Sequence, residues 1–205
     1  MTKDEQKRLE LFEEESRRLE AEGYTGRDLT TSALNANLLG TLLGALVAAP
    51  GVVVFLLRKF EVPDISGWQF TVIVIAGVIS IVVHELIHGI TWSLFAKNRF
   101  KSIAFGFIVE YLTPYCSCKE PLSGGAYSAG GIMPCIILGL IPEIIACFTG
   151  NAYLLGYGAF MTVCAGGDLL IISMILRDKK TKDALFFDHP TKVGLVKFVK
   201  KTEDQ

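Results

Sequence analysis

Charged residues are absent from long stretches of this 205-residue chain. No Lys, Arg, Asp or Glu occurs between Ala33 and Leu57, while hydrophobic residues make up 51% of the sequence and the mean hydropathy is +0.43. These values are high for a water-soluble domain of this length, so the sequence indicates one domain of a membrane protein. The remaining charges crowd at the two ends with both signs, and this pattern predicts no nucleic-acid partner.

The sequence also lacks an apolar leader and a paired set of cysteines. About the first thirty residues are charged throughout, so we expect no cleavable signal peptide. The cysteines are Cys116, Cys118, Cys135, Cys147 and Cys164. Three of them lie in apolar runs, and we expect all to be reduced. Cys116 and Cys118 form a Cys-x-Cys pair without the second pair of a structural zinc site, which favours two free thiols over a metal site.

Four apolar runs are long enough to cross a hydrocarbon core of roughly 30 Å. They cover residues 33–57, 68–96, 126–148 and 152–176. We therefore predict an all-α membrane protein with about four transmembrane helices, in a domain that covers residues 33–176. Pro50 is expected to kink the first span.

Polar segments flank this domain on both sides. Residues 1–32 predict a water-exposed amphipathic helix, closed by Gly23 and Gly26 and followed by the capping residue Ser32 or its neighbours Thr30 and Thr31. Residues 177–205 form a basic tail. Because basic residues near span ends favour the cytoplasmic side, we expect a multi-pass protein of the cell membrane with both termini in the cytoplasm.

Residues 97–123 are too polar to span the bilayer. Their alternation of aromatic and β-branched residues, with Gly and Pro between them, predicts a short cytoplasmic β-hairpin or a re-entrant segment. The aromatic side chains are typical of anchors at the membrane interface. A weaker hypothesis is that Glu110 and Tyr111 cover a site on the preceding span, where a substrate strand would pair.

The second apolar run carries three titratable residues, His84, Glu85 and His88, in the pattern His-Glu-x-x-His. On a helix the two histidines share one face and reach one metal ion. Glu85 lies about 100° further round, where it accepts a proton from a water molecule without being a ligand. Charge is costly inside a bilayer, so such a cluster marks a functional interior more often than a decayed or structural polar cluster.

A catalytic zinc usually has three protein ligands, and Asp168 is the best candidate for the third. It is the one charged residue in the run 152–176, and both His84 and Asp168 lie sixteen positions beyond the start of their runs. At about 1.5 Å per residue both side chains lie at the same depth. The alternative is a polar bond between helices or a break at Gly166-Gly167. Glu143 is a competing carboxylate, and His189 in the tail is expected to be a surface residue.

These residues resemble those of known families. HELIHG at 84–89, TPYCSCKEPLS at 113–123, GGD at 166–168 and DHPTKVG at 188–194 resemble the putative zincin peptidase family, and more distantly the site-2 protease class. The wider class implies a three-helix core, a third-ligand Asp on a later helix, and hydrolysis of membrane-embedded peptide bonds. That class places Gly after the ligand Asp, whereas here two Gly residues precede Asp168.

The predicted function is that of a Zn²⁺-dependent metallopeptidase, with His84, His88 and Asp168 as metal ligands and Glu85 as catalytic base. Its partners would be the lipid bilayer and a membrane protein or peptide substrate. The alternative from another class is a non-catalytic metal-binding membrane protein, either a pseudoprotease or a transporter. Hydrolysis of a non-peptide membrane substrate is a third interpretation. The sequence does not indicate the oligomeric state.

Overall fold

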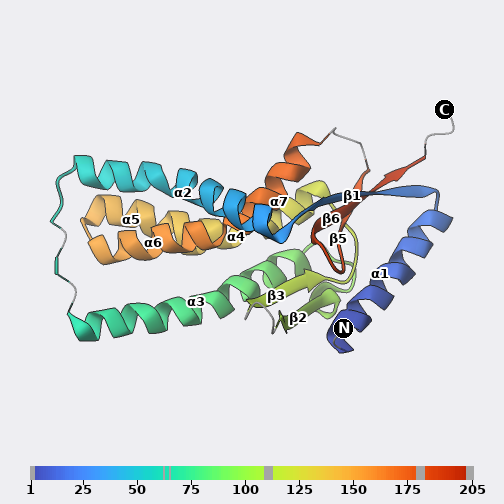
Figure 1. Ribbon diagram of the computed structural model, residues 1–205, viewed down its shortest axis with the longest axis horizontal. Helices are drawn as coiled ribbons and strands as arrows, with labels where there is room; N and C mark the ends of the chain where they lie inside the picture. Colours follow the sequence, from blue (N-terminus) through green and yellow to red (C-terminus); the bar gives the residue numbers. More distant parts are fainter. Residues whose placement is uncertain (1–2, 62, 65, 109–112, 179–182, 202–205) are drawn as a thin grey trace.

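The computed structural model describes residues 3–61, 63–64, 66–108, 113–178 and 183–201. Within them the chain forms an elongated body, with a bundle of apolar helices at one end and a small sheet beside a charged helix at the other (Figure 1). The described chain is mostly helical, as predicted, but besides a hairpin it contains a four-stranded antiparallel sheet that the sequence did not predict.

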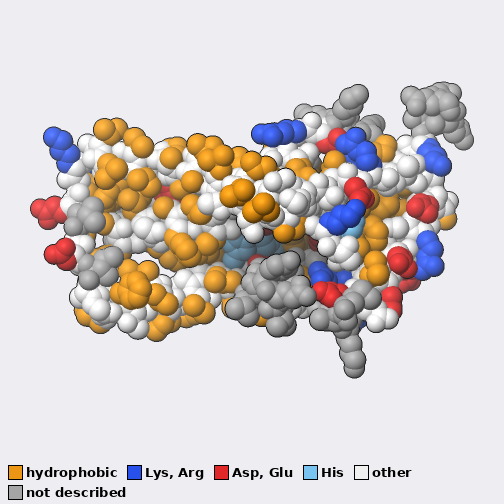
Figure 2. Space-filling model, viewed as in Figure 1, with side chains coloured by type: hydrophobic (Ala, Val, Ile, Leu, Met, Phe, Trp, Pro, Cys, Tyr) orange, Lys and Arg blue, Asp and Glu red, His pale blue; other side chains and the backbone are white. Residues whose placement is uncertain are grey.

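In the part of the chain that the structure describes, three helical segments are long and apolar enough to cross a membrane. They are α2 (Ala33–Leu57), α3 (Gly67–Ser93) and the run Gly124–Thr149. This third run comprises α4 (Gly124–Pro134), a π-helical stretch (Cys135–Leu140) and α5 (Ile141–Thr149). Large apolar side chains lie exposed along these helices, and Figure 2 shows them gathered over the helical end. Exposed apolar side chains of this kind are typical of helices that face lipid.

The predicted fourth span is not one straight helix. It consists of α6 (Ala152–Cys164) and α7 (Gly166–Arg177), which meet at an angle of 49°. The pair provides a fourth crossing if it is counted as one span. The break falls at Ala165, immediately before Gly166 and Gly167. Glycine has no Cβ, so the backbone changes direction there at little steric cost.

Local signals account for two of the helix starts. The Ser32 hydroxyl accepts a hydrogen bond from the backbone N–H of Asn35 at 3.2 Å and caps α2, as the sequence predicted. Before α3, the Gln69 side chain accepts from the backbone N–H of Ser66 at 2.9 Å, which completes a capping box. Helix α2 continues through Pro50.

The two ends of the chain meet in a four-stranded antiparallel sheet. Its strands, in spatial order, are β1 (Tyr24–Thr31), β6 (Val193–Lys200), β5 (Leu185–Asp188) and β4 (Leu122–Ser123). Tyr24 pairs with Lys200, so the first strand depends on a partner at the opposite end of the sequence. The N-terminal segment and the tail were predicted without strands because such distant pairing leaves no local periodic signal.

Successive residues of this sheet pack on opposite faces. Phe187 and Val196 contact Leu19 of α1 (Lys3–Ala21), so the apolar side of the predicted amphipathic helix is buried on the sheet. Their neighbours Phe186 and Leu195 pack on the other face, toward the ends of α3 and α4. The sheet therefore joins the polar segments to the helices that carry the predicted site.

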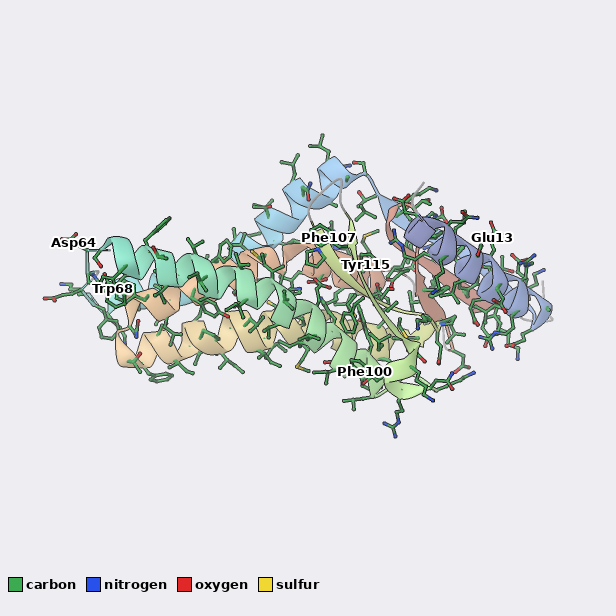
Figure 3. All side chains as sticks on the ribbon, turned by 90° about the horizontal axis from the view of Figure 1, so that it is seen from below. Glu13, Asp64, Trp68, Phe100, Phe107 and Tyr115 are labelled. Atoms are coloured by element: carbon green, nitrogen blue, oxygen red, sulfur yellow. The ribbon has the colours of Figure 1, made fainter. Side chains whose placement is uncertain are left out.

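A separate two-stranded sheet lies beside the C-terminal half of α3 (Figure 3). Strands β2 (Ile103–Ile108) and β3 (Thr113–Cys118) pair antiparallel, so of the two predictions for residues 97–123 the hairpin is the one observed. Phe105 packs over Gly89, where a Cβ would lie 2.5 Å from its ring. Glu110 and Tyr111 lie outside the described residues.

Candidate metal centre

Helix α3 brings His84 and His88 together as the sequence spacing requires. Their Nε2 atoms are 3.0 Å apart, and only 8% and 3% of the two residues is exposed. Residues four positions apart in a helix lie one above the other on the same face, and both rings point into the protein. Histidine side chains are visible in a hollow between α3 and the helices above it (Figure 2).

Asp168 completes the cluster from the first turn of α7. Its two oxygens lie 3.1 Å from the Nε2 of His84 and 3.4 Å from the Nε2 of His88. Close packing of α7 on α2 sets this position, since a Cβ on Gly166 would lie 2.1 Å from the carbonyl oxygen of Gly40. The absence of a side chain at Gly166 therefore lets α7 lie close to α2, with Asp168 near the histidines.

The orientation of the His88 ring is fixed by contacts with Gly130 and Trp92. Its Nδ1 lies 2.9 Å from the carbonyl oxygen of Gly130, which only accepts, so Nδ1 carries the proton and donates it. The Nε2 of a neutral His88 then presents a lone pair to the cluster. The Trp92 ring stacks on His88 with 5.0 Å between ring centroids and 13° between planes. Trp92 in turn donates its Nε1–H to the carbonyl of Tyr127 at 3.1 Å.

The donor set fits a zinc ion. One ligand atom each from His84, His88 and Asp168 lie within 4.8 Å of one another. The two Nε2 atoms are 3.0 Å apart, one Asp168 oxygen lies 3.1 Å from the Nε2 of His84, and the other lies 3.4 Å from that of His88. Ligands about 2.0–2.2 Å from a tetrahedral zinc are separated by roughly 3.3 Å. Two ring nitrogens and a carboxylate oxygen at this spacing repel one another unless a cation or a proton lies between them. Three donors also leave a fourth position for water, as in catalytic zinc sites.

Glu85 faces a cavity beside the cluster. The cavity has a volume of about 140 Å³ and is lined by Ile81, His84, Glu85, Pro114, Met161 and Cys164. Its walls therefore come from α3, from α6 and from strand β3. The Glu85 carboxylate accepts a hydrogen bond from the backbone N–H of Cys116, which holds it on the strand side of the cavity.

The two competing residues lie elsewhere. Glu143 is buried, and its carboxylate accepts a hydrogen bond from the Thr162 hydroxyl at 2.7 Å, between α5 and α6. His189 lies at the end of the sheet, where its Nδ1 accepts from the backbone N–H groups of Thr191 and Lys192. Burial lowers the pKa of His189, which keeps its ring neutral. Neither belongs to the metal-binding group that the described residues form.

The cysteine pair forms no metal group in the described part of the chain. All five cysteines are free, and burial raises the pKa of the Cys118 thiol to about 11. Burial also raises the pKa of Cys116. Both thiols are therefore protonated at neutral pH.

Three supporting residues were missed in the sequence. Trp92 follows His88 by one helical turn. This spacing was the available signal, because it places Trp92 on the same face of α3 as the two histidines. The carbonyl of Gly130 accepts a hydrogen bond from His88, and a Cβ on Gly130 would lie 2.0 Å from Trp92. No local pattern in the sequence indicated the contact of Tyr127 with Trp92, because the two residues are 35 positions apart.

Comparison with known families agrees with this geometry. Residues 77–182 match the putative zincin peptidase family, over more than half of the chain and including all four residues of the predicted site. Comparisons with curated proteins and with solved structures gave no match. The chain belongs to the putative zincin peptidase family.

Proposed function

We propose that this protein is a zinc-dependent metallopeptidase that hydrolyses peptide bonds of membrane proteins at or within the bilayer. The observation that carries the proposal is the convergence of His84, His88 and Asp168 beside a cavity that Glu85 faces. Three donors with an open side suit catalysis, and a carboxylate next to two ligand histidines is the arrangement that metallopeptidases use for proton transfer.

Each residue has a defined task in this reaction. A zinc ion held by His84, His88 and Asp168 would lower the pKa of a water molecule toward 7 and polarise the scissile carbonyl. Glu85 takes the proton from the attacking water and passes it to the leaving amine. The Cys116 N–H holds the Glu85 carboxylate at the cavity wall, and Gly130 keeps the His88 lone pair directed at the cluster.

The location of the site supports a membrane substrate. His84 lies on α3, whose exposed side chains are almost all apolar along its length. The cavity beside the site is lined by α3, α6 and strand β3 of the hairpin, and Figure 3 shows that hairpin alongside α3. A transmembrane helix hides its carbonyl carbons in hydrogen bonds, so the substrate segment must unwind before water attacks it.

The proposed topology is a multi-pass protein of the cell membrane with both termini in the cytoplasm. Both termini lie at the sheet end of the molecule, as four crossings require (Figure 1). Basic and acidic side chains gather at that same end, and basic residues favour the cytoplasmic side (Figure 2).

The test is to compare the wild type with Glu85→Gln. Both proteins are purified in detergent, analysed for zinc, and incubated with solubilised membrane proteins, whose new N-termini are identified by mass spectrometry. We expect about one zinc per chain in both proteins and new termini only with the wild type. Equal sets of termini from the two proteins would refute peptidase activity at Glu85.

The same experiment distinguishes the proposed peptidase from the alternative, a non-catalytic metal-binding protein. A non-catalytic pseudoprotease or transporter would retain zinc in both proteins and yield no new termini from either. Absence of near-stoichiometric zinc from the wild type would reject both interpretations together.

A further inference from the structure

Asp188 is a carboxylate outside the metal cluster. It contacts Tyr127 of helix α4 and Cys118 of strand β3, two elements that pack beside the cluster. It ends strand β5 and belongs to the DHP sequence at 188–190. Its Oδ1 accepts a hydrogen bond from the buried Tyr127 hydroxyl, and the carboxylate also accepts the backbone N–H of Cys118. Asp188 therefore joins the sheet to helix α4 on one side and to strand β3 on the other.

The first of these contacts leads to His88. The Tyr127 carbonyl accepts the Nε1–H of Trp92, whose ring stacks on His88. One turn along the same helix, the Gly130 carbonyl accepts the Nδ1–H of His88. A rotation or shift of α4 would disturb both contacts of His88 at once, because both belong to the same helix.

The second contact leads to Glu85. Backbone N–H groups two residues apart in a strand point to the same side. On β3 these are the N–H of Cys118, bound to Asp188, and the N–H of Cys116, bound to Glu85. The carboxylates of Asp188 and Glu85 therefore bind the same edge of β3. The position of the Cys116 N–H depends on the bond between Asp188 and Cys118, because the two cysteines belong to one strand.

We propose that Asp188 is a positioning residue of the metal site, which holds His88 through Tyr127 and Glu85 through strand β3. The proposal rests on the proposed function, since it assigns a role toward the metal and the base. Asp188 touches neither the metal ligands nor Glu85 in the described contacts, so it acts only through these neighbours. Outer-shell partners of this kind alter metal affinity by about 10- to 100-fold.

The experiment uses the full chain in detergent, with Co²⁺ as a spectroscopic substitute for zinc. We compare Asp188→Ala, which removes both hydrogen bonds, with Asp188→Asn, whose amide oxygen still accepts from Tyr127. The expected result is that Ala shifts the visible Co²⁺ spectrum and weakens Co²⁺ binding about 10- to 100-fold. Asn should restore most of the affinity, because it restores the acceptor.

Glu120→Ala is the matched control. The Glu120 carboxylate accepts from the backbone N–H groups of Lys97 and Asn98 and from the Ser102 hydroxyl, so its loss disturbs a neighbouring turn. None of these contacts reaches His88 or Glu85. We expect a lower thermal midpoint with an unchanged Co²⁺ spectrum. If Asp188→Ala and Glu120→Ala gave the same spectrum as the wild type, the positioning role would be overturned.

A second variant decides the question if Asp188→Ala does not fold. Tyr127→Phe deletes only the hydroxyl that binds Asp188, and we expect it to weaken Co²⁺ binding and shift the spectrum. Unchanged binding in Tyr127→Phe would overturn the link to His88. Failure of the wild type itself to bind Co²⁺ would instead reject the proposed function.

Discussion

The Nε2 of His84 lies 3.1 Å from a carboxylate oxygen of Asp168, although the two residues are 84 positions apart in the chain. Helix α3 carries the first and the broken pair α6–α7 carries the second. The contact exists because α7 changes direction at Ala165 and packs closely on α2. The candidate metal site therefore depends on how three apolar helices pack.

Replacing Asp168 should remove one metal ligand. We expect Asp168→Asn to weaken zinc binding by at least about 100-fold, since even outer-shell changes cost 10- to 100-fold. Competition with a chromogenic chelator measures the affinity. Glu143→Gln is the matched control, because its amide oxygen still accepts from Thr162 and it lies outside the cluster. Equal affinity in both variants would show that Asp168 is not a ligand.

Gly130→Ala should push α4 away from α3. The added Cβ would lie 2.0 Å from Trp92, whereas the Cβ of Gly125→Ala meets nothing within 4 Å. We expect Gly130→Ala to lower the free energy of unfolding by about 1–3 kcal/mol and to weaken zinc binding, because His88 loses its acceptor. Denaturation in mixed micelles and zinc titration measure the two effects. Similar losses in Gly125→Ala would contradict the packing explanation.

The stability of the sheet end should depend on pH through His189. Burial holds its pKa below the ordinary value of 6.5, so the folded chain binds this proton less readily than the unfolded chain. Stability is therefore complete above about pH 6.5 and decreases as the pH falls through 6.5 toward the folded pKa. Protonation also removes the acceptor of the Thr191 and Lys192 N–H groups.

The measurement is the thermal midpoint at pH 7.5 and pH 5.5 for the wild type and for His189→Asn. Asn accepts hydrogen bonds but does not titrate, so the midpoint should fall less on acidification in the variant. All other titratable groups are the same in both proteins, so their contributions cancel in the comparison. An identical fall in both proteins would rule out His189 as the source.

Tyr157→Phe should loosen α3 from α6 at the edge of the cavity. The Ser80 and Tyr157 hydroxyls are 2.8 Å apart and join the two helices one turn before His84. Such a bond contributes about 0.6 kcal/mol in membrane proteins, so its loss should raise exposure of the cavity about threefold. The rate of maleimide labelling at Cys164, followed by mass spectrometry, reports this exposure because Cys164 lines the cavity.

Tyr153→Phe provides the comparison for that measurement. Tyr153 lies on the same helix, but its hydroxyl donates to the Asp64 carbonyl at the far end of the bundle. Its loss should leave the labelling of Cys164 unchanged. Faster labelling in both variants would point to a general loosening of α6.

The sequence by itself determined the apolar helices and the two histidines. Runs such as 33–57 predict membrane helices from composition alone, and the spacing of His84 and His88 places both rings on one face of α3 because helical geometry is local. Glu85 follows from the same spacing. The alternation of residues 97–123 likewise predicted a hairpin or a re-entrant segment, and Ser32 was one of three predicted capping residues.

Only the tertiary structure decided what these residues meet. The sequence predicts Asp168 as the third ligand from its depth along an unbroken span, whereas the observed contact depends on the bend at Ala165. The pairing of Tyr24 with Lys200 and the contacts of Gly130 and Trp92 with His88 depend equally on distant segments. Such contacts form between residues far apart in the chain, and no local periodicity in the sequence records them.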